Sequence, residues 1–265
     1  MLRAVCERAP RSPSRTGWRR RAAGVVWRGA LLAAIAGIAI LSSSRLAHAT
    51  GRDFVDETMV AEGMRARETG LEFGTDARID NSDAMQGWFG AAMEYGVTSR
   101  WLLEAVGLAL DRGQGLEAAG WRAETRYVLL VGDRAPVAAA VALEWEVETS
   151  AAKHPLYERV LIPRLVLSRV FAGSLLATAN GGVAKQLDPV ERSAFAWAAG
   201  ARWPDRGPVC AGLEITREPL DDATRLVPQL ALDLGEARVR MGGAFGIKGP
   251  YRFIARIVIE KELEW

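Results

Sequence analysis

Apolar and polar residues alternate along most of the chain after residue 70. In the last segment, Phe253 and Ile257 fall on one face of an extended strand, and Arg256 and Glu260 fall on the other. The segment 137–148 repeats the pattern, with aliphatic residues alternating with glutamates. Successive side chains of a β-strand point to opposite faces, so a period of two predicts amphipathic strands. The chain is therefore expected to be all-β.

Turn signals divide this region into strands of similar length. Examples are Gly132–Pro136 and Pro204–Gly207, which are rich in glycine, proline and aspartate. The resulting count is about twelve, an even number of the kind that single-chain bacterial barrels require. The predicted strands are 71–80, 86–97, 101–112, 117–131, 137–148, 158–169, 173–184, 191–203, 208–217, 226–234, 237–247 and 251–264.

Alternation alone does not say which face is inside, since a soluble β-barrel shows the same period with its apolar face inward. The aromatic residues favour a membrane barrel, because they fall near the two ends of the predicted strands, as interfacial rings do. One set is Tyr95, Trp101, Trp203 and Trp265, and the other is Trp121, Trp145, Tyr157 and Tyr251. The predicted fold is an antiparallel up-and-down transmembrane β-barrel of about twelve strands, in which a closed sheet satisfies the backbone against lipid.

The N-terminal segment predicts export. Arg19, Arg20, Arg21 and Arg28 precede the apolar run 30–41, and a small-residue site ends at Ala49. This order is typical of a secretory signal peptide, and the run is shorter than the roughly 20 residues of a spanning helix. We assign residues 1–49 to the signal peptide. Its removal takes away nine of the 34 basic and one of the 32 acidic residues, which leaves a net charge of −6. A nucleic-acid partner is not expected.

The end of the chain has a pattern of its own. Ile257, Ile259, Leu263 and Trp265 follow at alternate positions, and the final residue is aromatic. This resembles the C-terminal strand of bacterial outer-membrane β-barrel proteins. Residues 70–265 as a whole resemble small, uncharacterised barrels of about twelve strands, including the hairpin sequence EYGVTSRW at 94–101. The resemblance implies an outer-membrane location, contact with outer-membrane lipid and assembly by the barrel-assembly machinery through these four residues. It implies no substrate.

Residues 50–69 lack the alternation of the remaining chain. Phe54, Met59, Val60 and Met64 could form one stripe of a short helix. We expect a periplasmic segment that is a short helix or disordered. It would plug the periplasmic mouth of the barrel or lie on the membrane surface.

Charged residues of both signs occupy the predicted inward positions. They would either pair into a polar core that closes a narrow barrel, or line a small water-filled pore. Glu104 and Cys210 share this orientation, although the alternation around Glu104 is weak, and Cys210 is interpreted as a filler. The predicted lumen residues are Glu72, Asp76, Arg78, Glu94, Arg122, Glu124, Arg126, Glu144, Glu146, Arg164, Glu214, Arg238, Arg240, Arg252, Arg256 and Glu260.

Few residues that carry chemistry remain after the predicted cleavage site. His154 is then the only histidine and Cys210 the only cysteine, so no Cys/His metal site is expected, and no cofactor motif is present. The favoured hypothesis is a narrow channel for small solutes or a structural barrel, and not an enzyme. The first alternative is a soluble periplasmic β-barrel that binds a ligand. A lipid-modifying enzyme using Ser150 and His154 is the least favoured.

Overall fold

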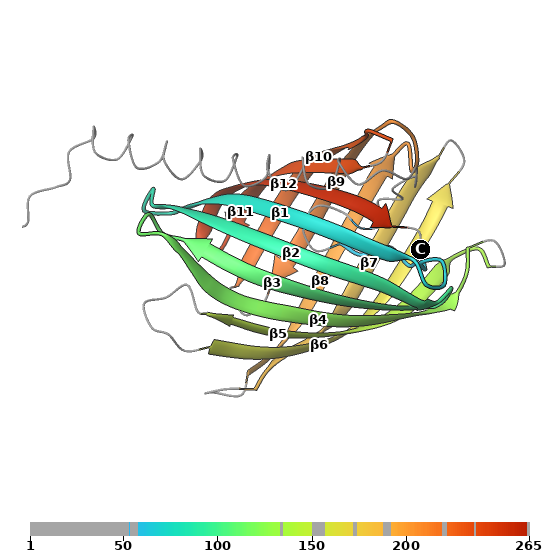
Figure 1. Ribbon diagram of the computed structural model, residues 1–265, viewed down its shortest axis with the longest axis horizontal. Coiled ribbons are helices and arrows are strands. Elements are labelled where there is room, and N and C mark those ends of the chain that lie inside the picture. Colours follow the sequence, from blue (N-terminus) through green and yellow to red (C-terminus); the bar gives the residue numbers. More distant parts are fainter. Residues whose placement is uncertain are drawn as a thin grey trace, which may run out of the picture.

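The computed structural model describes residues 53, 58–132, 135–149, 157–171, 174–187, 192–218, 222–235 and 237–263. These residues form a closed barrel of antiparallel strands (Figure 1), which confirms the predicted fold class. The twelve strands are β1 (Thr69–Asp80), β2 (Met85–Thr98), β3 (Trp101–Asp111), β4 (Leu116–Leu130), β5 (Ala138–Thr149), β6 (Tyr157–Phe171), β7 (Leu175–Gln186), β8 (Arg192–Trp203), β9 (Val209–Glu218), β10 (Ala223–Asp233), β11 (Arg238–Lys248) and β12 (Tyr251–Leu263).

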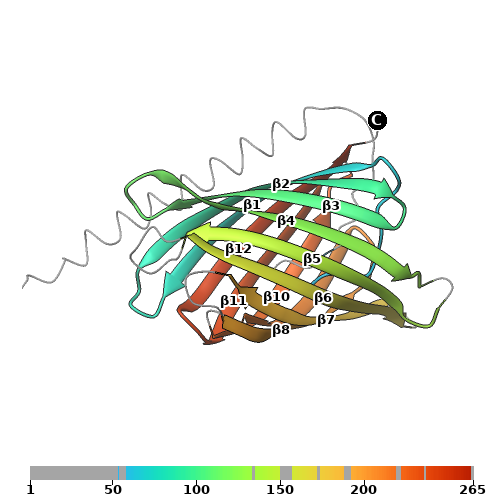
Figure 2. The same cartoon turned by 90° about the horizontal axis from the view of Figure 1, so that it is seen from below.

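Every strand pairs with its neighbours in the sequence, and β1 pairs with β12 to close the sheet. The strands run obliquely around the barrel (Figure 2), as closure of a sheet requires. The largest shift from the predicted bounds is in β10, which begins three residues early, at Ala223. Its pairing with β11 skips Val227 and Pro228. Proline has no N–H to donate, which explains the weak strand signal there.

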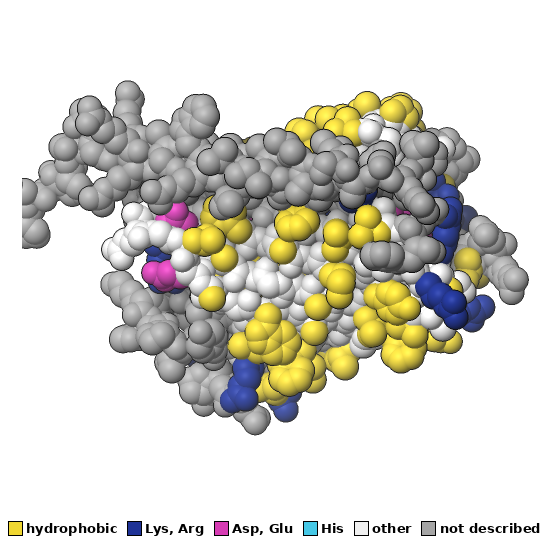
Figure 3. Space-filling view, in the orientation of Figure 1, with side chains coloured by type: hydrophobic (Ala, Val, Ile, Leu, Met, Phe, Trp, Pro, Cys, Tyr) yellow, Lys and Arg dark blue, Asp and Glu magenta, His cyan; other side chains and the backbone are white. Residues whose placement is uncertain are grey.

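The outer surface of the wall is apolar. Figure 3 shows hydrophobic side chains across the visible wall and Lys and Arg side chains near its ends. Exposed aromatic rings lie toward both ends, with Trp101 and Trp203 toward one and Trp121 and Trp145 toward the other. A soluble barrel would place its charges on this surface, whereas a lipid-facing barrel places them inside. The arrangement is that of a membrane-spanning barrel.

A bulge at the start of β12 changes the orientation of two predicted residues. Ile79 pairs with Phe253 and Asp80 pairs with Tyr251, so Arg252 is an extra residue in the ladder. Tyr251, predicted on the outer face, is therefore buried. Arg252, predicted in the lumen, has a side chain that is 61% exposed and pairs with Asp83 at 2.6 Å. The side chain of Tyr157 and the whole of Trp265 lie outside the described residues.

Residues 58–68, called the strap below, lie inside one end of the barrel. They form an irregular chain without a helix, in place of the short helix or disorder that was predicted for 50–69. Residues 50–52 and 54–57 of that predicted segment, including Phe54, lie outside the described residues. Met59, Val60 and Met64 are buried there. Arg67 donates its backbone N–H to the carbonyl of Gly96, and Gly96 donates its N–H to the carbonyl of Glu68. The lumen wall supplies the packing surface and the hydrogen-bond partners, which the strap sequence alone does not reveal. None of the described residues forms a helix that could cross a membrane.

Candidate functional site in the lumen

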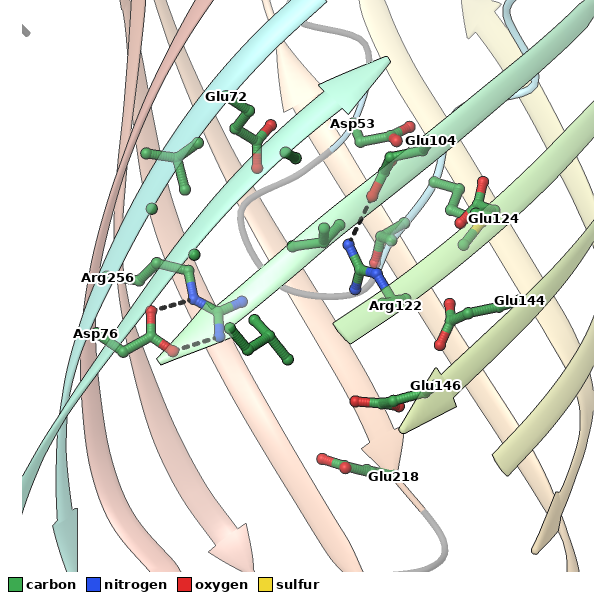
Figure 4. Close-up of a pocket in the computed structure, with 18 of the residues that line it drawn as sticks. Asp53, Glu72, Asp76, Glu104, Arg122, Glu124, Glu144, Glu146, Glu218 and Arg256 are labelled. Atoms are coloured by element: carbon green, nitrogen blue, oxygen red, sulfur yellow. Dashed lines mark hydrogen bonds and ion pairs between the residues drawn. The ribbon is translucent and has the colours of Figure 1, made fainter. Parts of the chain in front are cut away.

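The barrel encloses a cavity of about 240 Å³ beside the strap. Its wall carries ten carboxylates and seven guanidinium groups. An eighth guanidinium group, that of Arg126, is buried behind the lining and pairs with two of these carboxylates, so the carboxylates exceed the guanidinium groups by two. Figure 4 shows Asp76 and Arg256 on one side of it and Glu144 and Glu146 on the other. The charges that alternate with apolar residues in the sequence therefore meet in one enclosed space.

Four of the carboxylates form a row that crosses neighbouring strands. Glu94 of β2 is directly opposite Glu104 of β3, Glu104 is opposite Glu124 of β4, and Glu124 is opposite Glu144 of β5. We call these four residues the glutamate row. Like charges directly opposite each other destabilise a sheet, so such a row requires nearby cations.

Arginines from the same wall supply those cations. Arg122 donates a hydrogen bond to Glu104 at 2.9 Å, and Arg164 donates one to Glu144 at 3.3 Å. Arg126, which is 2% exposed, binds Glu124 at 2.9 Å. Buried charges of this kind are tolerated only when they are paired and hydrogen-bonded. Arginines of β4 and β6 therefore balance part of the negative charge of the glutamate row.

A second cluster lies on β1 and β12. Asp76 accepts hydrogen bonds from Nε and Nη2 of Arg256, at 2.5 and 2.6 Å, and from Arg78 at 3.0 Å. The guanidinium of Arg78 stacks on Trp88, 4.2 Å from the ring centre, and lies 5.5 Å from the ring of Tyr251. Two guanidinium groups therefore bind the same carboxylate.

The chain before and within the strap is tied to the lumen charges. Asp53 accepts hydrogen bonds from both terminal nitrogens of Arg126, at 3.0 and 2.8 Å, and its backbone carbonyl accepts one from Arg240. The N–H of Thr58 donates to Glu214 at 2.6 Å. Burial raises the pKa of Asp53, but Arg126 and the backbone N–H of Val60 outweigh it, so the pKa is below its ordinary value. Asp53 is therefore an anion that anchors this end of the segment.

Two hydroxyl groups and two glycines complete the contacts of the strap. Ala61 donates its N–H to Oγ of Ser168, and Thr178 donates its hydroxyl to the carbonyl of Met59, at 2.8 and 2.7 Å. A Cβ atom at Gly63 would lie 2.3 Å from the carbonyl oxygen of Ser99. At Gly96 it would lie 2.2 Å from the carbonyl oxygen of Arg65. Strap and wall thus approach closely because both lack side chains there.

The structure places most predicted lumen residues on the cavity. Arg126, Glu214 and Arg238 are buried outside its lining, and Arg252 is at the barrel end, as described above. The predicted residues that line the cavity are Glu72, Asp76, Arg78, Glu94, Arg122, Glu124, Glu144, Glu146, Arg164, Arg240, Arg256 and Glu260.

Sequence reasoning missed four charged residues of the lining. Asp53 lies in a segment without alternation, Arg225 precedes the predicted start of its strand, and Arg217 and Glu218 end theirs. Arg225 and Glu218 form an ion pair at 2.5 Å. The two residues flank one predicted turn, and opposite charges at this spacing are the sequence signal that indicates their pairing. Glu104, whose orientation was weakly predicted, also lines the cavity.

Cys210 is buried and accepts a hydrogen bond from Arg238 at 3.4 Å. No group of acidic, histidine or cysteine side chains in the described part of the chain could hold a metal ion. Ser150 and His154 lie outside the described residues, so the structure does not place the predicted enzymatic pair.

The barrel is similar in fold to several solved structures. No family model and no curated protein matches the sequence. A KdgM porin superposes with a TM-score of 0.56 and 7% identity, over 74% of this chain and 99% of that one. An outer membrane channel from Pseudomonas putida F1, of the group COG4313, superposes with a TM-score of 0.57 and 10% identity, over 77% of this chain and 98% of that one. This chain has the fold of an outer-membrane β-barrel. A KdgM porin in complex with disordered oligogalacturonate also matches, with a TM-score of 0.52 and 7% identity, over 74% and 99%.

Proposed function

We propose that this protein is an integral outer-membrane channel for small polar solutes, and that the strap narrows one of its mouths. The observation that carries the proposal is a charge-lined cavity inside a barrel whose outer wall is apolar. The fold shared with a porin and an outer-membrane channel supports it. Those neighbours are not enzymes, which favours transport over catalysis.

The charge of the lining supports a preference for cations. Rings and rows of carboxylates favour cations in narrow pores because they compensate for lost hydration. The ten carboxylates of the lining outnumber its seven guanidinium groups and the buried Arg126 by two, which gives the cavity this character.

The proposed orientation places the strap on the periplasmic side. The β2–β3 turn at this end contains only Ser99 and Arg100, and periplasmic turns of outer-membrane barrels are short. Export would use the leader at 1–49, and assembly would use the C-terminal strand. Ile257 of that strand is exposed on the outer wall, where lipid and the assembly machinery could contact it.

The test is the reversal potential of the full-length protein in a planar bilayer under a KCl gradient. A heat-modifiability gel first confirms that each sample is folded. We expect cation preference in the wild-type protein and a weaker preference after the double substitution Glu144→Gln and Glu146→Gln, which removes two of the ten lining carboxylates. Glu117→Gln, at an exposed position of β4, is the matched control. Silence of folded protein, or a preference for anions, would contradict the proposal.

A further inference from the structure

Three aromatic side chains gather on the outer wall at the end of the barrel that holds the strap. Tyr95, Trp101 and Tyr127 belong to β2, β3 and β4, and each is 40–45% exposed. Trp101 is directly opposite Tyr127 in the ladder, and Tyr95 is opposite Leu103, the next outward residue of β3. The indole N–H of Trp101 donates to Oγ1 of Thr125 at 2.7 Å, which fixes the ring against β4. Amphipathic rings in this position mark the level of the lipid headgroups.

Two exposed arginines lie at the same corner. Arg100 is in the turn between β2 and β3, next to Trp101 in the chain. Arg67 is in the strap, where its backbone N–H donates to the carbonyl of Gly96 at 2.6 Å. Both side chains are exposed, and neither forms a hydrogen bond or an ion pair with another residue of the described chain. Figure 3 shows Lys and Arg side chains next to hydrophobic ones at this end of the wall, on the right.

The backbone holds both arginines at the rim of the barrel. Arg100 donates its N–H to Oγ1 of Thr98 at 3.2 Å, and its carbonyl accepts from the N–H of Val128 at 2.8 Å. Arg67 has a φ of 68°, in the left-handed region that few residues other than glycine, asparagine and aspartate adopt. Such a conformation persists only where its surroundings fix it, and it is often found at ligand-binding positions. The rim therefore presents two cations from fixed points of the chain.

The local charge and the neighbouring surface indicate what these cations would bind. The hairpin residues 95–101 and the adjoining strap residues 63–67 contain three arginines and no acidic residue. The planar guanidinium group of arginine forms bidentate hydrogen bonds with phosphate. The surface beside the two arginines is the lipid-facing wall with its aromatic rings. A ligand that joins a phosphate to an apolar part suits both surfaces, and a phospholipid has this composition.

We propose that Arg67 and Arg100 bind the phosphate of an anionic phospholipid. The glycerol and upper acyl chains of this lipid pack on the three aromatic rings. The inference goes beyond the proposed channel function and takes from it only the membrane location, with the strap on the periplasmic side, where the leaflet consists of phospholipid. Because Arg67 belongs to the strap and Arg100 to the wall, the bound phosphate also links these two parts of the chain.

The experiment counts bound lipids by native mass spectrometry on folded, full-length protein in detergent. The protein is mixed with equal amounts of phosphatidylglycerol and phosphatidylcholine that have the same acyl chains. We expect phosphatidylglycerol to bind about tenfold more tightly, because its headgroup lacks the ammonium group that the two arginines would repel. The double variant Arg67→Gln and Arg100→Gln should lose this preference. Arg67→Gln keeps the backbone N–H that binds Gly96, so the strap retains that hydrogen bond.

Arg206→Gln is the matched control. It removes the same charge at the same end of the barrel, but from the β8–β9 turn, where Arg206 pairs with Glu62 at 2.5 Å. The lipid preference should be unchanged in this variant. Equal loss in the control and in the single variants Arg67→Gln and Arg100→Gln would indicate a general attraction of anions and overturn the site. An unchanged preference in the folded double variant would also overturn it.

Competition distinguishes a lipid from a soluble phosphate. Glycerol 1-phosphate carries the same phosphate without acyl chains, and a large excess of it should leave phosphatidylglycerol bound. Displacement of the lipid would assign the arginines to a soluble anion and overturn the inference. Phosphatidylglycerol preference in a protein that is silent in bilayers would support the lipid site and reject the channel. Conduction without lipid preference would do the reverse.

Discussion

The close approach of the strap to the wall at Gly63 provides a test of whether the strap narrows the mouth of the barrel. A methyl group added at Gly63 would lie 2.3 Å from the carbonyl oxygen of Ser99, whereas ordinary contacts begin at 3.4 Å. The strap must therefore move by about 1 Å. Ser99 is in a turn fixed by the β2–β3 hairpin, so the strap is the partner that gives way. Gly63→Ala changes one methyl group and no charge.

The free-energy cost of Gly63→Ala follows from the hydrogen bonds that this movement of the strap strains. The bonds from Ala61 to Ser168 and from Arg67 to Gly96, at 2.8 and 2.6 Å, lie on either side of residue 63. The loss of each of these two hydrogen bonds costs about 0.5–1.5 kcal/mol, and we expect both to be lost. We expect the closed arrangement to lose about 1–3 kcal/mol, which corresponds to a roughly 5- to 150-fold shift toward the open state.

The assay is single-channel recording, with open probability as the readout. Gly107→Ala is the matched control, because a Cβ atom at Gly107 meets nothing within 4 Å. Gly63→Ala should raise the open probability and the control should not. If both variants behave like the wild-type protein while remaining folded, the strap does not close the mouth and the reasoning is refuted.

Two further predictions concern the anchor and the wall. The lowered pKa of Asp53 means that its contribution to strap binding is present above the ordinary value of 3.8 and is lost as the pH falls through the still lower folded value. Conductance should therefore rise only below about pH 4, and Asp53→Asn should show the raised conductance at neutral pH; a pH-independent wild-type conductance would contradict this. At Gly182, a Cβ atom would lie 2.0 Å from the carbonyl oxygen of Pro163, so Gly182→Ala should lower the unfolding temperature of the barrel on heat-modifiability gels, by the roughly 1–3 kcal/mol of an overpacked site. Gly107→Ala again serves as the control, and equal unfolding temperatures would count against the close approach of β6 and β7.

The fold could be read from the sequence because a membrane barrel repeats one local rule. The side chains of each strand alternate between a lipid face and a lumen face. The period of two therefore predicts both where the strands lie and which of their side chains face the lumen. The rule fails where the ladder is irregular. At Arg252 a bulge adds one residue, and it turns Tyr251 into the lumen and Arg252 out of it. Nothing in the alternation marks this position, since the turn and the pairing with β1 decide it.

The sequence by itself determined the strands, the apolar outer wall and most of the charged inner wall, because these follow from residues two apart. The tertiary structure decided which charges meet. Glu94, Glu104, Glu124 and Glu144 became one row through the registers of three hairpins, and Arg240 reached Glu72 only because β11 and β1 flank β12. The conformation of the strap also depends on the tertiary structure. Its buried positions follow no local period, since its partners are side chains that the closed barrel brings around it.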